Sequence, residues 1–149
     1  MRELVYLDSS VFVTSALKNM PVKIQTACEE WQRRIQSGEY KAVTSAITWA
    51  EVAFSVGKGA ENKFDNARAA TAGELIRRLP GLKIADVTRE VLETAEEILR
   101  RVGGRPRDCI HAATAAAEKA VLVTTDEDFG TLASKFPELG LVVTTLRDS

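Results

Sequence analysis

The chain has 149 residues, of which 45% are hydrophobic and 28% are charged, and its formal net charge is −1. This length and composition predict a single globular domain spanning 1–149 and exclude a disordered chain. No apolar run reaches the roughly 20 residues that a membrane span needs. The two cysteines, Cys28 and Cys109, are too few for a zinc site or a disulfide framework and are predicted to be buried thiols. We therefore expect a reduced, cytoplasmic protein with no membrane partner.

Strand-like and helix-like segments alternate along the chain. Short apolar runs predict strands at 3–7, 41–44, 82–85, 121–124 and 141–144. Helical patterns predict helices at about 10–18, 22–37, 46–56, 61–79, 88–102, 107–119 and 127–136. The first and fourth strands are continuous apolar runs, which is typical of a parallel sheet covered on both faces. This order predicts an α/β fold, a three-layer α/β/α sandwich around a parallel sheet of about five strands.

Two aspartates directly follow strands of this predicted sheet. Asp8 follows the apolar run of MRELVYLDSSVF, and Asp126 holds the corresponding place in LVTTDEDFG. Parallel strands lie about 4.8 Å apart, and ligands of such sheets bind beyond the carboxyl ends of the strands. The two carboxylates are therefore expected to be near neighbours, although Asp126 also has the position of a helix N-cap.

Two further acids fall near helix starts. Asp108 lies in GGRPRDCIHAATAAAEKA, in the first turn of a helix that Pro106 begins, where an acid also suits the helix dipole. Glu51 lies in TSAITWAEVAFS, three residues after Thr48, a spacing that fits a capping box. However, the apolar periodicity of this segment begins before Thr48. This favours a mid-helix position for Glu51 over a capping role.

The four acids together indicate a cation site. Asp8, Glu51, Asp108 and Asp126 all map to one edge of the predicted sheet. Crowded carboxylates repel one another and must take up protons or bind a cation. Oxygen ligands favour Mg²⁺ or Mn²⁺, and Mg²⁺ sites commonly use one or two carboxylates together with substrate phosphates. The pattern therefore predicts a metal-dependent reaction on a phosphate ester.

The four motifs YLDSSVF, TSAITWAEVAFS, RDCIHAATA and LVTTDEDFG resemble those of the PIN-domain ribonucleases, specifically the VapC-type toxins. The resemblance covers nearly the whole chain, although 57–80 matches only as a helical pattern. It implies that Asp8, Glu51, Asp108 and Asp126 form an acidic catalytic quartet. Asp8, Asp108 and Asp126 would hold Mg²⁺ or Mn²⁺, and Glu51 would hold a water and receive its proton.

The same resemblance implies accessory positions and partners. Ser9 and Thr124 match small polar positions beside the quartet, and Asp128 matches an acid often present in the last motif. The implied activity is hydrolysis of RNA phosphodiester bonds by an endoribonuclease. The implied partners are an antitoxin protein and a second copy of the chain in a homodimer.

Basic residues gather just before Asp108. Arg105 and Arg107 are predicted to contact RNA phosphate, whereas Arg100 and Arg101 equally fit a helix C-terminus. The single histidine, His111, is expected to be a hydrogen-bonded packing residue.

Aromatic residues are few. Trp31, Trp49 and Phe54 are candidates for core packing, a dimer contact or an antitoxin groove, and Phe12, Trp49 and Phe54 for the apolar anchor of an antitoxin. Base stacking is not predicted, because the aromatics do not interleave with the arginine cluster.

Other enzyme classes place an aspartate after the first strand. Haloacid-dehalogenase-type phosphatases need Asp-x-Asp, whereas this chain has Asp8-Ser9-Ser10. Response-regulator receivers need a lysine after the fifth strand, where this chain has Thr144-Thr145. Two alternatives of the same fold stay open: an RNA-processing nuclease that is not a toxin, and a module that binds RNA or protein without cleavage.

Overall fold

The computed structural model describes residues 3–59 and 63–148. Its centre is a five-stranded sheet in the order β3-β2-β1-β4-β5, and all four neighbouring pairs are parallel. The strands are β1 (Leu4–Leu7), β2 (Lys41–Ser45), β3 (Leu82–Ala85), β4 (Val121–Thr124) and β5 (Val143–Thr145). The predicted parallel sheet is confirmed.

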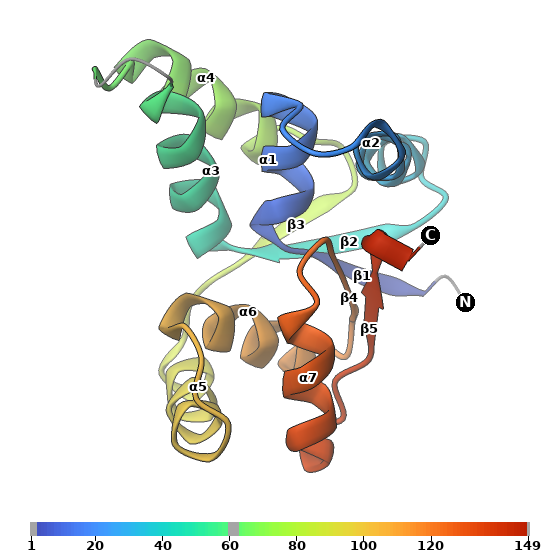
Figure 1. The fold of residues 1–149 in the computed structure, drawn as a ribbon, viewed down its shortest axis with the longest axis vertical. Coiled ribbons are helices and arrows are strands. Elements are labelled where there is room, and N and C mark those ends of the chain that lie inside the picture. The colour runs from blue at the N-terminus through green and yellow to red at the C-terminus, as the bar shows by residue number, and fades with distance from the viewer. Residues whose placement is uncertain (1–2, 60–62, 149) are drawn as a thin grey trace.

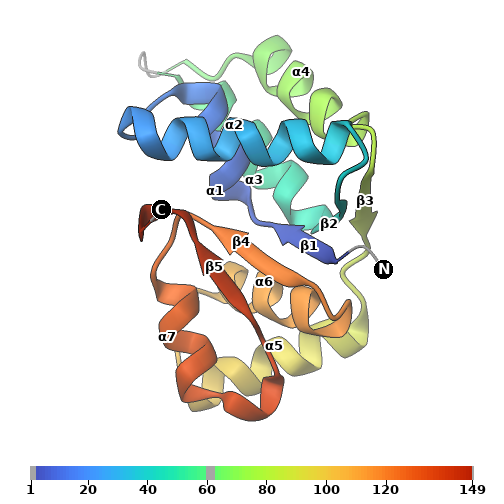
Figure 2. The same ribbon diagram turned by 90° about the vertical axis from the view of Figure 1, so that its right-hand side faces the viewer.

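Helices cover both faces of the sheet, so the predicted three-layer sandwich is confirmed (Figure 1). One layer contains α1 (Ser9–Leu17), α2 (Val22–Gln36), α3 (Ala46–Lys58) and α4 (Asn66–Arg77). The other contains α5 (Arg89–Arg101), α6 (Pro106–Ala117) and α7 (Asp128–Lys135). Short 3-10 helices, Pro137–Leu139 and Leu146–Asp148, flank β5. Figure 2 shows the same separation of the two helical layers from the side.

Alternating side chains of the central strand supply both halves of the core. Val5 and Leu7 pack with α1–α4, whereas Tyr6 packs with α5–α7, and all three are essentially unexposed. A strand buried on both faces reads as a continuous apolar run. This explains why the strand LVYL does not alternate between apolar and charged residues before Asp8.

The helix predicted at 61–79 differs most from the observed element. Residues 61–62 lie outside the described residues, and α4 begins at Asn66 because the Asp65 carboxylate accepts a hydrogen bond from the Arg68 amide at 3.0 Å. Its N-terminal boundary is a cap of the usual Asx type. The last strand is also displaced, from the predicted 141–144 to Val143–Thr145.

The strand order reverses between β1 and β4. The chain moves outward from β1 to β2 and β3 on one side, and then places β4 and β5 on the other side. Such a reversal leaves a crevice at the carboxyl ends of the two central strands. Asp8 directly follows β1 and Asp126 follows β4 by two residues, so the fold brings both to this crevice. Among the described residues, no helix is long and apolar enough to cross a membrane.

Candidate metal and nucleic-acid site

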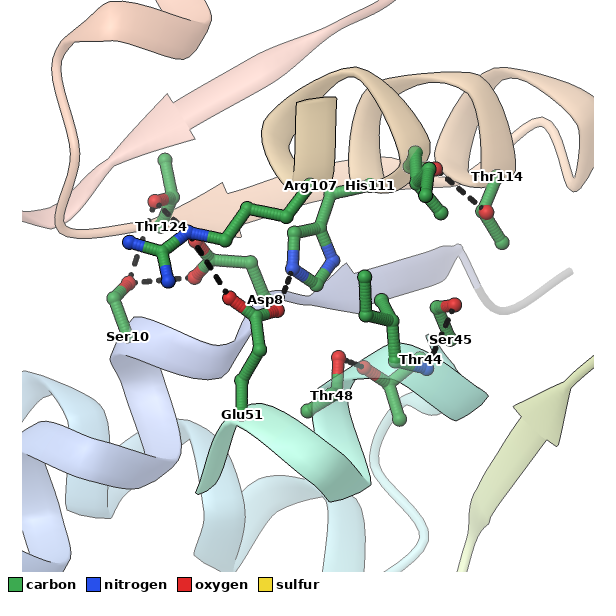
Figure 3. Close-up of polar contacts among 12 residues, drawn as sticks. Asp8, Ser10, Thr44, Ser45, Thr48, Glu51, Arg107, His111, Thr114 and Thr124 are labelled. Carbon is green, nitrogen blue, oxygen red and sulfur yellow. Dashed lines mark hydrogen bonds and ion pairs between the residues drawn. The ribbon is translucent and has the colours of Figure 1, made fainter. Parts of the chain in front are cut away.

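A cleft of about 410 Å³ opens at this reversal point. Asp8, Glu51, Asp108 and Asp126 all line it, and they come from four different parts of the chain. Further lining residues are Ser9, Ser10, Val13, Ala50, Phe54, Ser55, Arg105 and Arg107. Figure 3 shows Asp8, Glu51, Arg107 and His111 gathered between β1, α3 and α6. The tertiary structure therefore brings the whole predicted quartet to one cavity.

Asp8 is the most deeply buried of these acids, with 4% of its surface exposed. Ser10 Oγ donates a hydrogen bond to Asp8 Oδ1 at 2.6 Å, and Thr124 Oγ1 donates to Oδ2 at 3.0 Å. Burial raises the pKa of the Asp8 carboxyl from 3.8 to about 6, against the opposing effects of His111 and the two hydroxyl groups. A carboxylate that is desolvated to this extent is costly to ionise unless a cation approaches.

The β4–α7 turn is tied to Asp8 through Thr124 and Ser10. The Thr125 amide donates to Ser10 Oγ at 3.1 Å, and the Asp126 amide donates to Thr124 Oγ1 at 3.0 Å. Asp126 in turn accepts a hydrogen bond from the Asp128 amide at 2.9 Å, at the start of α7. The N-cap position of α7 is occupied by Glu127, so the N-cap alternative for Asp126 is wrong. Asp126 instead accepts a hydrogen bond within the turn through Oδ1 and lines the cleft.

Asp108 lies in the first turn of α6, as its sequence position indicates. Burial raises the pKa of the Asp108 carboxyl, and the negative charge of Asp126 raises it further, while His111, Arg105 and Arg107 act in the opposite direction. Asp108 and Asp126 come from separate elements, and their repulsion indicates that the two carboxylates lie near each other in the cleft. A cation placed between them would relieve this repulsion.

Glu51 lies within α3 and does not cap it. Ser45 is the N-cap and accepts a hydrogen bond from the Ile47 amide at 3.2 Å, while Thr48 is buried inside the helix. The Glu51 carboxylate instead crosses to α6, where Oε1 lies 2.5 Å from His111 Nε2 and Oε2 lies 3.5 Å from Arg107 Nε. The capping-box alternative is therefore wrong, and Glu51 is oriented by groups from the opposite layer.

His111 is a buried residue that links three elements. Its Nδ1 lies 2.6 Å from the Tyr6 hydroxyl on β1, and its Nε2 faces Glu51 on α3. Burial raises the pKa of the Tyr6 phenol, which therefore remains protonated and able to donate. Nε2 then carries the proton that Glu51 accepts. The packing prediction for His111 holds, but its sequence position, one turn after Asp108, gave no indication that it positions Glu51.

The accessory residues separate into two groups. Ser9 lines the cleft, but Ser10, which was not predicted, makes the hydrogen bond to Asp8. Thr124 binds Asp8 directly, whereas Asp128 lines a neighbouring pocket of about 330 Å³ that shares Arg105 and Asp108 with the cleft. The Ser-Ser pair after Asp8 could have suggested Ser10, because a side chain two residues away can reach back to the carboxylate.

The four arginines before Asp108 fall into two groups in the structure. Arg105 and Arg107 line the cleft, while Arg100 pairs with Glu96 at 3.5 Å and Arg101 with Glu138 at 2.8 Å. Arg101 also lies over the Phe136 ring, 3.9 Å from its centroid. The two earlier arginines therefore stabilise the α5 and α7 region.

The donor atoms of the cleft fit a hard divalent cation. They are carboxylate oxygens, with Asp8 already oriented and with Asp108 and Asp126 in mutual repulsion. Within residues 3–59 and 63–148, no three acidic, histidine or cysteine side chains are close enough to hold a metal by themselves. Mg²⁺ commonly keeps waters and substrate oxygens among its ligands, so one or two of these carboxylates are a sufficient protein contribution.

Comparisons with known proteins agree with this fold. The PIN domain family model matches residues 5–135. The VapBC2 structure from Rickettsia felis, bound to a promoter DNA fragment, has 19% identity and a TM-score of 0.67, and the match covers 95% of this chain and 98% of that chain. Mycobacterium tuberculosis VapC20, a Sarcin-Ricin loop cleaving toxin, has 19% identity and a TM-score of 0.66. The match covers 85% of this chain and 93% of that chain. FitAcB from Neisseria gonorrhoeae has 19% identity and a TM-score of 0.65. The match covers 96% of this chain and 98% of that chain. No curated protein matches.

The raised pKa of the Asp8 carboxyl predicts how the stability of the metal-free protein depends on pH. Its folded-state pKa of about 6 lies above its usual value, so the protonated form favours folding at acidic pH, and this contribution is lost as the pH rises through about 6. Asp8→Asn should therefore stabilise the metal-free protein at pH 7.5, by at most about 3 kcal/mol, and have little effect near pH 4. Denaturant unfolding in EDTA at both pH values measures this. The exposed Asp86→Asn is the matched control, and an equal effect of Asp8→Asn at both pH values would contradict the interpretation.

Proposed function

Because the chain belongs to the PIN domain family, we propose that it is a divalent-metal-dependent endoribonuclease and the toxin of a toxin–antitoxin pair. The observation that carries the proposal is the convergence of Asp8, Glu51, Asp108 and Asp126 on one cleft. Asp108 and Asp126, taken alone, each have an ordinary structural explanation in a helix first turn or in the turn before a helix. The meeting of all four acids in one cavity, with two arginines on its wall, has the chemistry of a phosphodiester hydrolase.

In this proposal Asp8 and Asp108 are the direct metal ligands, and Asp126 contributes through a metal-bound water. Asp8 is fixed by two hydroxyl donors, and Asp108 and Asp126 present their repelling carboxylates to the same space. When bound, Mg²⁺ or Mn²⁺ supplies charge neutralisation at the phosphate and lowers the pKa of a coordinated water. Asp8, with its raised pKa, gains most from a cation because ionisation is then offset by the ion's charge.

Glu51 has the role of orienting the attacking water and accepting its proton. Its carboxylate is held by His111 Nε2 at 2.5 Å, and the imidazole is held in turn by Tyr6. A group that moves a proton must be placed within hydrogen-bond reach of it. The hydrogen-bonded chain from β1 through α6 gives Glu51 this fixed position without blocking its second oxygen. Arg107 lies 3.5 Å from that oxygen.

Arg105 and Arg107 are the proposed phosphate contacts. Both are exposed and line the cleft beside Asp108. Within the part of the chain that the structure describes, Arg107 has an ion pair only with Glu51, and Arg105 has none. Arg105 is therefore available to bind the RNA backbone, and Arg107 can exchange its 3.5 Å contact with Glu51 for a phosphate. Backbone contacts dominate the affinity of nucleic-acid binding and make it depend on salt.

An antitoxin and a homodimer complete the proposal. Proteins of similar fold include a toxin–antitoxin complex from Klebsiella pneumoniae and VapBC-5 from Mycobacterium tuberculosis, a member of the VapBC family of toxin–antitoxin systems. An arginine of an antitoxin can enter the cleft and pair with two carboxylate oxygens at once. Trp49 and Phe54 are exposed and fit the apolar anchor, whereas Phe12 is buried and is not available for it.

The first test concerns the acids. Asp8→Asn or Asp108→Asn should lower Mg²⁺- or Mn²⁺-dependent cleavage of RNA by about 10²-fold or more, because each removes charge that stabilises the reacting centre. Cleavage rates on any RNA that the wild type cuts measure this, with circular dichroism as the check on folding. Asp86→Asn, also an acid just after a strand but exposed and outside the cleft, should keep the wild-type rate. Wild-type rates in both cleft variants would refute the site.

The second test concerns the arginines. Replacing Arg105 and Arg107 with Ala should weaken RNA binding and reduce the slope of log affinity against log salt by up to about two. Fluorescence anisotropy with a labelled RNA at several salt concentrations measures the slope. Arg100→Ala, which removes a charge that pairs with Glu96 on α5, is the control. An unchanged slope in the double variant would assign both residues to a structural role.

The third test concerns the antitoxin. A co-expressed protein from the neighbouring reading frame should inhibit cleavage, compete with Mn²⁺ and bind more weakly to Glu51→Ala, because its arginine and the cation need the same carboxylates. Titration calorimetry at low and high Mn²⁺ measures the competition, and light scattering measures the homodimer. A monomer, together with inhibition that is indifferent to metal, would be inconsistent with this arrangement.

A further inference from the structure

Two phenylalanine rings are exposed side by side, and one of them, Phe54, lines the cleft. Phe54 on α3 is 58% exposed and Phe64 is 48% exposed, whereas the chain's other three phenylalanines are buried. The two rings stack with centroids 6.2 Å apart and an interplanar angle of 27°. Large apolar side chains that stay exposed side by side mark a surface that meets a ligand or partner.

The local backbone is built to hold this pair. Gly57 lies one turn beyond Phe54 on α3, and a Cβ atom there would lie 2.6 Å from the Phe64 ring and 2.8 Å from Ala69 Cβ. Glycine inside a helix costs about 1 kcal/mol relative to alanine. The Asp65 amide also donates to the Gly57 carbonyl at 2.8 Å, which fixes the segment that carries Phe64. Phe64 is thereby seated against α3 and supports Phe54.

Phe54 stands next to the reaction site. It lies one turn after Glu51 on α3 and lines the same cleft, together with Arg105 and Arg107 from α6. The cleft therefore combines acids, guanidinium groups and an exposed aromatic ring. A single-stranded nucleotide has the matching parts: a phosphate for the charged groups and a flat base for the ring.

We propose that Phe54, supported by Phe64, is a stacking platform for an unpaired RNA base whose neighbouring phosphate lies in the cleft; this rests on the proposed nuclease function. Every base has a π-face, so the platform selects single-stranded over paired RNA without selecting a sequence. Phosphate contacts alone could not make this distinction. When no antitoxin is bound, the occupant is a base, because the ring shares its cavity with Arg105, which has no ion pair within the described residues, and with the reacting acids. The base and the antitoxin anchor would then compete for Phe54.

The test compares two labelled decamers on an Asp8→Asn background, which prevents cleavage. One is oligouridylate and the other is the same ribose–phosphate chain without bases, and Kd is measured by anisotropy in Mg²⁺. Base–aromatic stacking predicts that the protein prefers oligouridylate by about 5- to 150-fold. Phe54→Leu should abolish this preference, and Phe54→Trp should retain it. Trp49→Leu removes an exposed aromatic that does not line the cleft and should leave the preference unchanged.

The possible outcomes of this test distinguish the stacking platform from the proposed nuclease function. If both decamers bind but Phe54→Leu keeps the preference for oligouridylate, the platform is refuted and the nuclease function stands. If Phe54→Leu converts a dimer into a monomer in light scattering without changing the preference, the rings are an interface between two copies and the platform is again refuted. If neither decamer binds and no RNA is cleaved by the wild type, the nuclease function fails and the platform fails with it.

Discussion

The burial of one carboxylate at the end of the central strand is the constraint on which the rest of the site depends. β1 is covered by helices on both faces, so Asp8, which directly follows it, is desolvated and has a raised pKa. Two hydroxyl groups, from α1 and β4, orient the carboxylate but do not neutralise it. Asp8 is therefore stabilised by binding either a proton or a cation. The reversal of strand order beside it leaves a crevice that can hold the cation.

A hydrogen-bonded chain connects the opposite helical layers of the sandwich. Tyr6 on β1 contacts His111 on α6, which contacts Glu51 on α3. Each member is satisfied by its neighbour, so a polar path crosses the core without an unpaired buried side-chain atom among the described residues. Because both ring nitrogens of His111 are hydrogen-bonded, the imidazole fixes both the position and the orientation of the Glu51 carboxylate.

The cleft has two chemically different walls. The α6 side supplies Asp108, Arg105 and Arg107, whereas the α3 side supplies Glu51 and, one turn further, the exposed Phe54. The helical period places Glu51 and Phe54 on one side of α3, and Gly57 permits Phe64 to support Phe54. The segment 57–80, which carried little information as a sequence, thus contributes to the cleft through packing.

The sequence by itself determined the order of the elements, the parallel sheet and the association of Asp8 with Asp126, because strand burial and turn positions are local properties of the chain. It also indicated Glu51 as a mid-helix acid. Only the tertiary structure decided that Ser10 binds Asp8, that His111 positions Glu51 and that Phe54 lines the same cleft as the arginines. These relations depend on how helices from opposite layers rotate and pack against the sheet. Periodicity tells which face of a helix is apolar, but the distance between α3 and α6 is set by the core between them.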